Sequence, residues 1–170
     1  MKVIVYMTLT ANGYFPVAGA GQTLPKEVLA DFVGLVATTR YLIVGRRTYE
    51  GIGSMGPARA LLERVPVVVV TRAAAPVPGA LTVPSPQAAL DLFYEQGHTT
   101  ALVAGGAEVD GPFLSAGLFD ELRLNIHPAI GGVGRPVPIA DGAFTSLELR
   151  STPRLIGEHT VQLEYAAMRS

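Results

Sequence analysis

The chain has 170 residues, of which 49% are hydrophobic and 16% charged. This balance excludes a disordered protein and predicts one packed domain over residues 1–170. The net charge is −1 and there is no basic run, so neither nucleic acid nor an acidic membrane surface is expected as a partner. Cysteine is absent, which excludes disulfides, thiolate nucleophiles and cysteine-based zinc sites and fits a cytoplasmic protein.

Strands and helices alternate through the first part of the chain. Residues 3–9 are rich in β-branched side chains and predict a buried strand, which an Asn-Gly turn ends. A helix is expected to open at Pro25 with Thr23 as its cap, because apolar residues then follow the helical period up to Val36. A second strand is predicted over residues 41–44, and Gly45 closes it.

The middle of the chain continues this alternation. A helix is expected from Arg46, broken by the glycines of residues 51–57, with a short helical piece over residues 59–64. Residues 65–70 are nearly all valine and predict a strand buried on both faces. A short strand over residues 81–83 precedes a helix that Ser85 caps and Pro86 opens, running to about residue 96.

The last part begins with a strand over residues 100–104, a Gly-Gly pair and a helix over residues 108–116. A strand is predicted over residues 118–128, followed by two antiparallel strands within residues 146–165 that turn near Gly157. There, Val161, Leu163 and Tyr165 alternate with Gln162 and Glu164, which predicts one buried face and one wet face. The expected architecture is α/β: a mostly parallel central sheet, helices on both faces and antiparallel edge strands at the C-terminus.

Polar residues follow four of the predicted strands, and in such a sheet the carboxyl ends of parallel strands form the ligand-binding rim. The four ends are residues 10–12, 46–48, 71–72 and 105–106. Guanidinium groups suit phosphates, and a Gly-Gly turn before a helix lets a phosphate approach backbone N–H groups. The pattern therefore predicts a nucleotide across the rim, and the number of arginines favours NADPH over NADH because of the extra 2′-phosphate. Each arginine taken alone would be read as a solvated surface charge.

The order and spacing of five stretches resemble the dihydrofolate reductase-like family that includes the C-terminal reductase domain of the riboflavin biosynthesis deaminase-reductase. The stretches are VIVYMTLTANGYF, YLIVGRRTYE, VVVVTR, ALVAGGAEV and GLFDELRLNIHPAIGGVGRP. The resemblance implies a dihydrofolate reductase-like fold, NADPH as hydride donor and often a homodimer, which fits the low charge content.

The resemblance also assigns roles by position. Residues expected to contact the cofactor are Gly45, Arg46, Arg47, Thr48, Thr71, Arg72, Gly105, Gly106, Ala107, Glu108 and Val109. Thr10 and Asn12 are expected on the catalytic, substrate-facing side near the nicotinamide, and Tyr14 would contact the substrate. The implied activity is a stand-alone NADPH-dependent reductase that passes a hydride to a C=N or C=O bond of a small pterin- or aminopyrimidine-like substrate.

Two positions depart from the family pattern. Asn12 stands where the family usually carries an aspartate, and an amide cannot act as a general acid, so the proton would come from water or another group. Ala104 replaces an acidic residue before the Gly-Gly pair. Two alternatives therefore stay open: a dimeric nucleotide-binding module without turnover, or a structural dimer with a vestigial rim. His98, His127 and His159 lack metal-ligand spacing, and no metal is expected.

Overall fold

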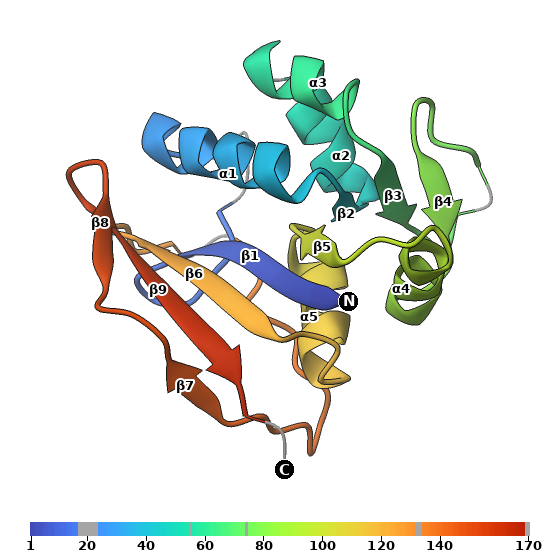
Figure 1. The fold of residues 1–170 in the computed structure, drawn as a ribbon. Coiled ribbons are helices and arrows are strands. Elements are labelled where there is room, and N and C mark those ends of the chain that lie inside the picture. Colours follow the sequence, from blue (N-terminus) through green and yellow to red (C-terminus); the bar gives the residue numbers. More distant parts are fainter. Residues whose placement is uncertain (17–23, 55, 74, 132–133, 169–170) are drawn as a thin grey trace.

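The computed structural model describes residues 1–16, 24–54, 56–73, 75–131 and 134–168, which form one nine-stranded sheet with helices on both faces (Figure 1). The strands are β1 (Lys2–Thr10), β2 (Leu42–Gly45), β3 (Val67–Val70), β4 (Leu81–Val83), β5 (Thr100–Val103), β6 (Glu121–His127), β7 (Leu147–Leu149), β8 (Arg154–Ile156) and β9 (Thr160–Ala167). The helices are α1 (Lys26–Thr39), α2 (Arg46–Gly53), α3 (Gly56–Leu62), α4 (Pro86–Glu95) and α5 (Ala107–Ser115).

The strand order is β4-β3-β2-β5-β1-β6-β9-β7, with β8 also paired to β9. Neighbouring strands from β4 to β6 are parallel, whereas β9 runs antiparallel to β6 and pairs antiparallel with β7 and β8. This confirms the mostly parallel sheet with antiparallel C-terminal strands. β5 returns to lie between β1 and β2, which creates a change of winding direction where ligands of open α/β sheets bind.

Two apolar clusters cover the two faces of the sheet, because successive strand side chains point to opposite sides. One cluster joins the sheet to α1, α2 and α3, and the other joins it to α4 and α5. Val69 belongs to the first cluster and Val68 to the second, so β3 is buried on both faces as its valine run predicts. Figure 1 shows α1–α3 on one side of the sheet and α4 and α5 on the other.

The two helices between β2 and β3 differ from the expected boundaries. α2 extends through Gly51 and Gly53, because Ile52 between them is buried in the core and this packing outweighs the low helix propensity of glycine. α3 spans Gly56–Leu62 rather than residues 59–64. The N-cap of α1 is Pro25, whose side chain cannot cap, and the expected cap Thr23 lies outside the described residues.

The C-terminal region corrects two expectations. Three strands replace the two expected ones, since the short strands β7 and β8 pair with successive parts of β9 and Pro153 lies in the gap between them. Gln162 does not face water: its side chain is only 1% exposed. The expectation of one wet face was wrong because α1 and β8 contribute polar partners for Gln162, so the alternating pattern does not separate core from solvent here.

None of the helices in the described part of the chain is long and apolar enough to cross a bilayer.

Candidate functional site

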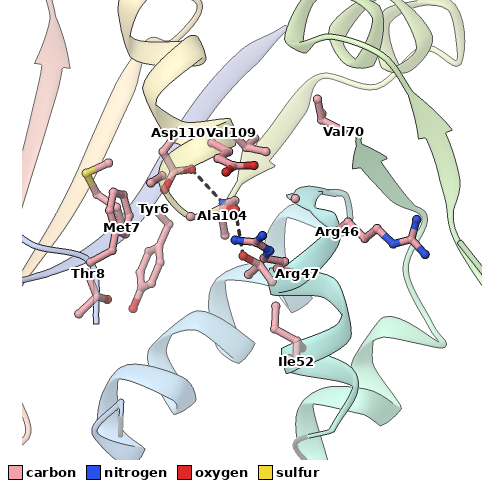
Figure 2. A pocket seen from close by; sticks show the side chains of 18 of the residues that line it. Tyr6, Met7, Thr8, Arg46, Arg47, Ile52, Val70, Ala104, Val109 and Asp110 are labelled. Atoms are coloured by element: carbon pink, nitrogen blue, oxygen red, sulfur yellow. Dashed lines mark hydrogen bonds between the residues drawn. The ribbon is translucent and has the colours of Figure 1, made fainter. Parts of the chain in front are cut away.

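A cavity of about 1150 Å³ opens where β2, β3 and β5 end and α2 and α5 begin (Figure 2). All the residues expected to contact the cofactor line this cavity: Gly45, Arg46, Arg47, Thr48, Thr71, Arg72, Gly105, Gly106, Ala107, Glu108 and Val109. Segments up to about 60 positions apart in the sequence thus meet at one rim, since the carboxyl ends of parallel strands share one edge of the sheet. The volume exceeds what one drug-sized ligand needs.

The strand ends approach so closely that two of them require glycine. A Cβ on Gly45 would lie 2.8 Å from the carbonyl oxygen of Gly105, and a Cβ on Gly105 would collide with the side chain of Val109. The hydroxyl of Thr48 donates a hydrogen bond of 2.9 Å to the Gly105 carbonyl, so α2 and the Gly-Gly turn are held together. The missing side chain of Gly45 makes room for the Gly105 backbone, and that of Gly105 makes room for the Val109 side chain in the helix that follows.

One end of the cavity is suited to anions. Arg47 and Arg72 are exposed and form no salt bridge within the described residues, whereas Arg46 pairs with Glu50 at 3.0 Å on the same helix. The N-termini of α2 and α5 both lie at this end, because α2 begins at Arg46 and α5 at Ala107. First-turn amides and the positive ends of helix dipoles favour negative charge, and they add to the guanidinium groups.

The backbone amides of the Gly105–Gly106 turn already have a hydrogen-bond acceptor within the protein. The N–H of Gly105 donates a 2.9 Å hydrogen bond to Oδ1 of Asp110, and the N–H of Gly106 also donates to this carboxyl. The amides of Ala107 and Glu108, in the first turn of α5, have no carbonyl within the helix to bond. These two amides are therefore the backbone donors that an external anion would meet.

Asp110 is 1% exposed and lies on the cavity wall (Figure 2). Burial penalises its charged form and raises the pKa of the carboxyl to about 8, although the two glycine amides act in the opposite direction. The carboxyl therefore keeps its proton at neutral pH. Asp110 was not predicted as a site residue, because an aspartate inside a helix is most often a surface residue.

The other end of the cavity is largely apolar. Its lining includes Met7 from β1 and three residues of α1, which are Val28, Leu29 and Phe32. The helical spacing of the α1 residues does not by itself distinguish a cavity wall from the core, since both have the same helical period. Tyr6 and Thr8 supply the hydroxyl groups of this end.

These hydroxyl groups are tied to a buried polar network. The hydroxyl of Tyr6 donates to Asp31 at 3.1 Å or to the Val28 carbonyl at 3.2 Å, and Asn125 Nδ2 donates to Thr8 Oγ1 at 3.2 Å. Burial raises the pKa of Tyr6 above its usual range, and the neighbouring Asp31 carboxylate raises it further. Tyr6 is therefore a neutral donor whose proton is held away from the cavity centre.

Gln162 connects the two halves of this network. Its Nε2 donates to Asn125 Oδ1 at 2.8 Å and to Asp31 Oδ2 at 3.0 Å, while Arg154 donates to Asp31 Oδ1 at 2.7 Å. Burial alone would raise the pKa of Asp31, but the hydrogen bonds from Arg154, Gln162 and Tyr6 outweigh it and lower the pKa. The network thus holds Asp31 as a carboxylate directly behind the cavity wall.

The residues expected on the substrate side lie elsewhere. Thr10, Asn12 and Tyr14 are not among the residues that line the cavity. Thr10 Oγ1 donates to Asn12 Oδ1 at 2.8 Å and accepts from the Tyr14 amide at 3.1 Å. The Asn12 side chain donates one hydrogen bond to the backbone of Gly131 and accepts another from it. These bonds connect the turn after β1 to the segment after β6. Only three of the four predicted strand ends therefore reach the cavity, and a substrate role for these three residues stays a prediction.

Arg135 is a cavity residue that the sequence analysis missed. It follows the Gly-rich segment after β6 and pairs with Glu108 at 3.2 Å, joining that segment to the first turn of α5. Arg135 lies in one of the stretches that resemble the family, but an arginine in a loop has no periodic pattern that would indicate a cavity position. Within the described ranges, no three His, Asp or Glu side chains form a group that could hold a metal.

The fold is shared with several solved structures. A protein assigned to riboflavin biosynthesis from Shewanella sp. PV-4 is 18% identical, with a TM-score of 0.76 over 99% of this chain and 100% of its own. A pyrimidine reductase-like protein from Corynebacterium diphtheriae is 15% identical, with a TM-score of 0.76 over 99% of this chain and 92% of its own.

A third similar structure is longer. It is a diaminohydroxyphosphoribosylaminopyrimidine deaminase/5-amino-6-(5-phosphoribosylamino)uracil reductase from Thermotoga maritima, 15% identical, with a TM-score of 0.70 over 98% of this chain and 56% of its own. No match is found among curated protein sequences. The model of the RibD C-terminal domain matches residues 1–161, and the chain therefore belongs to the RibD C-terminal domain family, with its dihydrofolate reductase-like fold.

Proposed function

We propose that the protein is an NADPH-dependent reductase that adds a hydride to a C=N or C=O bond of a small aminopyrimidine-like substrate. The observation that carries this proposal is the single cavity with an anion-binding end and an apolar end, lined by every residue expected to contact the cofactor. Family membership supports the oxidoreductase class and its link to riboflavin biosynthesis. The reductase named in the Thermotoga maritima protein supports an aminopyrimidine as the substrate class.

Residues in different parts of the cavity would bind different parts of the cofactor and substrate. Arg72 and Thr71, at the end of β3, would hold the 2′-phosphate, and the first-turn amides of Ala107 and Glu108 would hold the pyrophosphate. NADPH would supply the hydride. The apolar end would bind the nicotinamide and the substrate ring and exclude water. Such positioning is the main contribution of a protein to cofactor chemistry.

The proposal is tested by comparing the binding of NADPH with that of NADH, which lacks the 2′-phosphate. Replacing Arg72 with Ala should raise the Kd for NADPH about tenfold or more, because a charge-assisted contact contributes roughly 1.5–3 kcal/mol, while the Kd for NADH changes less than about twofold. Calorimetry gives both constants. Arg64→Ala, an exposed arginine away from the cavity, is the matched control. Equal losses for the two cofactors would contradict the role of Arg72, and no binding of NADPH by the wild type would contradict the proposal.

A second function is favoured by the surroundings of Asn12. This amide serves to hold the backbone of Gly131 and cannot donate a catalytic proton, so the end of β1 has no acid. The alternative is a nucleotide-binding module without turnover. This alternative predicts that the wild type binds NADPH but does not oxidise it in the presence of any of three probes. These are 5-amino-6-(5-phosphoribosylamino)uracil, the aminopyrimidine from which deamination forms it, and dihydrofolate. NADPH oxidation with any of these would exclude it.

A further inference from the structure

The cavity has few groups that can deliver a proton. Its described lining contains no His, Lys or Cys, and its carboxyl groups belong to Glu108 and Asp110. Glu108 is exposed and paired with Arg135, whereas Asp110 is 1% exposed. Tyr6 is the remaining acidic hydroxyl, but it is directed to Asp31 and the Val28 carbonyl.

Asp110 lacks a cationic partner. Within the described residues it forms no salt bridge, and its carboxyl is contacted by backbone amides of the Gly105–Gly106 turn. An isolated buried carboxylate is costly, so the neutral acid is favoured. A neutral carboxyl still accepts a hydrogen bond from Gly105 at Oδ1 while it carries a proton, so the turn keeps its geometry in this form.

The charged groups around Asp110 come from several elements. Glu108 lies on the same helix, Arg46 and Arg47 on α2, and Arg135 on the segment after β6; all of them line the same cavity. Glu108 and Arg135 neutralise each other, and Glu50 neutralises Arg46. Arg47 is then the one cavity cation of this group without a salt bridge in the described chain, and a phosphate bound there would cancel its charge. Binding of an anionic nucleotide would therefore favour the protonated carboxyl further.

We propose that Asp110 is the acid of this cavity and gives its proton to the substrate during reduction. This proposal rests on the proposed reductase function. A hydride, which carries two electrons, adds to the carbon of the C=N or C=O bond, and the π electron pair moves to the nitrogen or oxygen. That atom takes the proton of Asp110, leaving an amine or alcohol, an oxidised nicotinamide and the Asp110 carboxylate, which recovers a proton from solvent after product release.

The position of Asp110 fits this role. α5 packs against β1, so Asp110 lies between the anion-binding end and the apolar end formed in part by Met7 and Tyr6, as Figure 2 shows. A substrate ring in the apolar end would have this carboxyl on its edge. The family pattern carries an aspartate at the position of Asn12, which this chain lacks, and Asp110 would supply an acid from another element instead.

The first measurement needs no ligand. Infrared difference spectra of the wild type should show the carbonyl band of a protonated carboxylic acid at pH 7, which disappears with a midpoint near pH 8. Asp110→Asn should lack the band, because its amide oxygen can still accept from Gly105 but holds no titrating proton. Asp91→Asn, an exposed aspartate on α4 outside the cavity, should retain it. A wild-type spectrum without this band would overturn the proposal.

The second measurement uses NADPH and 5-amino-6-(5-phosphoribosylamino)uracil as probes. Asp110→Asn should lower kcat by roughly 100-fold or more, the usual contribution of a general acid, and leave the Kd for NADPH within about threefold. The wild-type kcat should fall tenfold per pH unit above about pH 8, whereas the residual rate of Asp110→Asn should not show this fall.

The outcomes separate the two proposals. NADPH oxidation that is unchanged in Asp110→Asn, with the infrared band present in the wild type, would overturn the donor role and leave the reductase function in place. No NADPH oxidation by the wild type with any aminopyrimidine or folate probe would contradict the reductase function, and the donor role with it. Loss of both kcat and NADPH binding in Asp110→Asn would mean that Asp110 holds the turn and is not the donor.

Discussion

At the residue scale, the charge state of Asp110 has a consequence for stability that can be measured apart from any ligand. The carboxyl is buried between α5 and the Gly105–Gly106 turn, and its pKa is raised from 3.8 to about 8. The unfolded chain loses this proton at the ordinary pKa, whereas the folded protein retains it to much higher pH. The free energy of unfolding must therefore depend on pH in a defined window.

Replacing Asp110 with Asn should stabilise the fold near neutral pH. The wild-type free energy of unfolding should decrease as the pH rises from 3.8 to about 8 and level off above this range. Because each pKa unit corresponds to about 1.4 kcal/mol, the variant should gain a few kcal/mol at pH 7 and little at pH 4. Urea denaturation across this range measures both proteins. Parallel pH curves for the two would contradict the raised pKa.

At the scale of elements, the polar network between α1, β6 and β9 replaces apolar packing on one part of the sheet. Asn125 and Gln162 are essentially fully buried, and their amide groups bond each other at 2.8 Å. Asp31 from α1 completes the network at its outer side. This arrangement fixes the register of β9 against β6 and places α1 over the cavity end that Tyr6 lines, since each polar group has only one set of partners in reach.

Replacing Gln162 with Leu should destabilise the protein by about 1–3 kcal/mol, because Asn125 Oδ1 and Asp31 Oδ2 would each lose a buried partner. Chemical denaturation measures the change. Gln87→Leu, an exposed glutamine on α4, is the matched control and should change stability by less than about 0.5 kcal/mol. A variant as stable as the wild type would show that the network contributes no net stability.

At the scale of the whole molecule, large apolar side chains are exposed mainly in the C-terminal third of the chain. Ile130, Phe144 and Leu155 are 80%, 89% and 62% exposed. β7 and β8 form an edge of the described sheet beyond β9, and this edge presents unpaired strand backbone. Isolated apolar residues are common on surfaces, but several of them in one part of the chain, together with an open sheet edge, agree with the homodimer that the family resemblance implies.

We expect the protein to sediment as a dimer, with the surface around Phe144 at the interface. Phe144→Ser should weaken the dimer about tenfold or more, because it removes a large apolar contact from the buried surface. Analytical ultracentrifugation over a range of concentrations measures the dissociation constant. Tyr94→Ser, at an exposed residue of α4, should leave it unchanged. A wild type that is monomeric at all concentrations would contradict the dimer.

Local sequence patterns predicted most of the helices and strands correctly, and the errors concern residues whose surroundings such patterns do not show. The valine run of β3, the Ser85 cap of α4 and the Gly-Gly turn before α5 depend on short-range preferences that a sequence displays directly. Gln162 was misread because its partner Asp31 comes from an element more than 100 positions away in the sequence. The cavity contacts of the α1 residues could not be predicted, because core and cavity wall use the same helical face.

The order of strand ends and the residue types that follow them were enough to predict an anion-binding rim, since parallel strands bring their carboxyl ends to one edge whatever the side chains elsewhere. Which strand ends meet was decided only by the tertiary structure. The return of β5 between β1 and β2 brings Arg46, Arg72 and Gly105 to one cavity, while Asn12 is held by Gly131 outside it. The same packing removed water from Asp110, and a change of solvent environment is a property of the folded chain that no stretch of sequence contains.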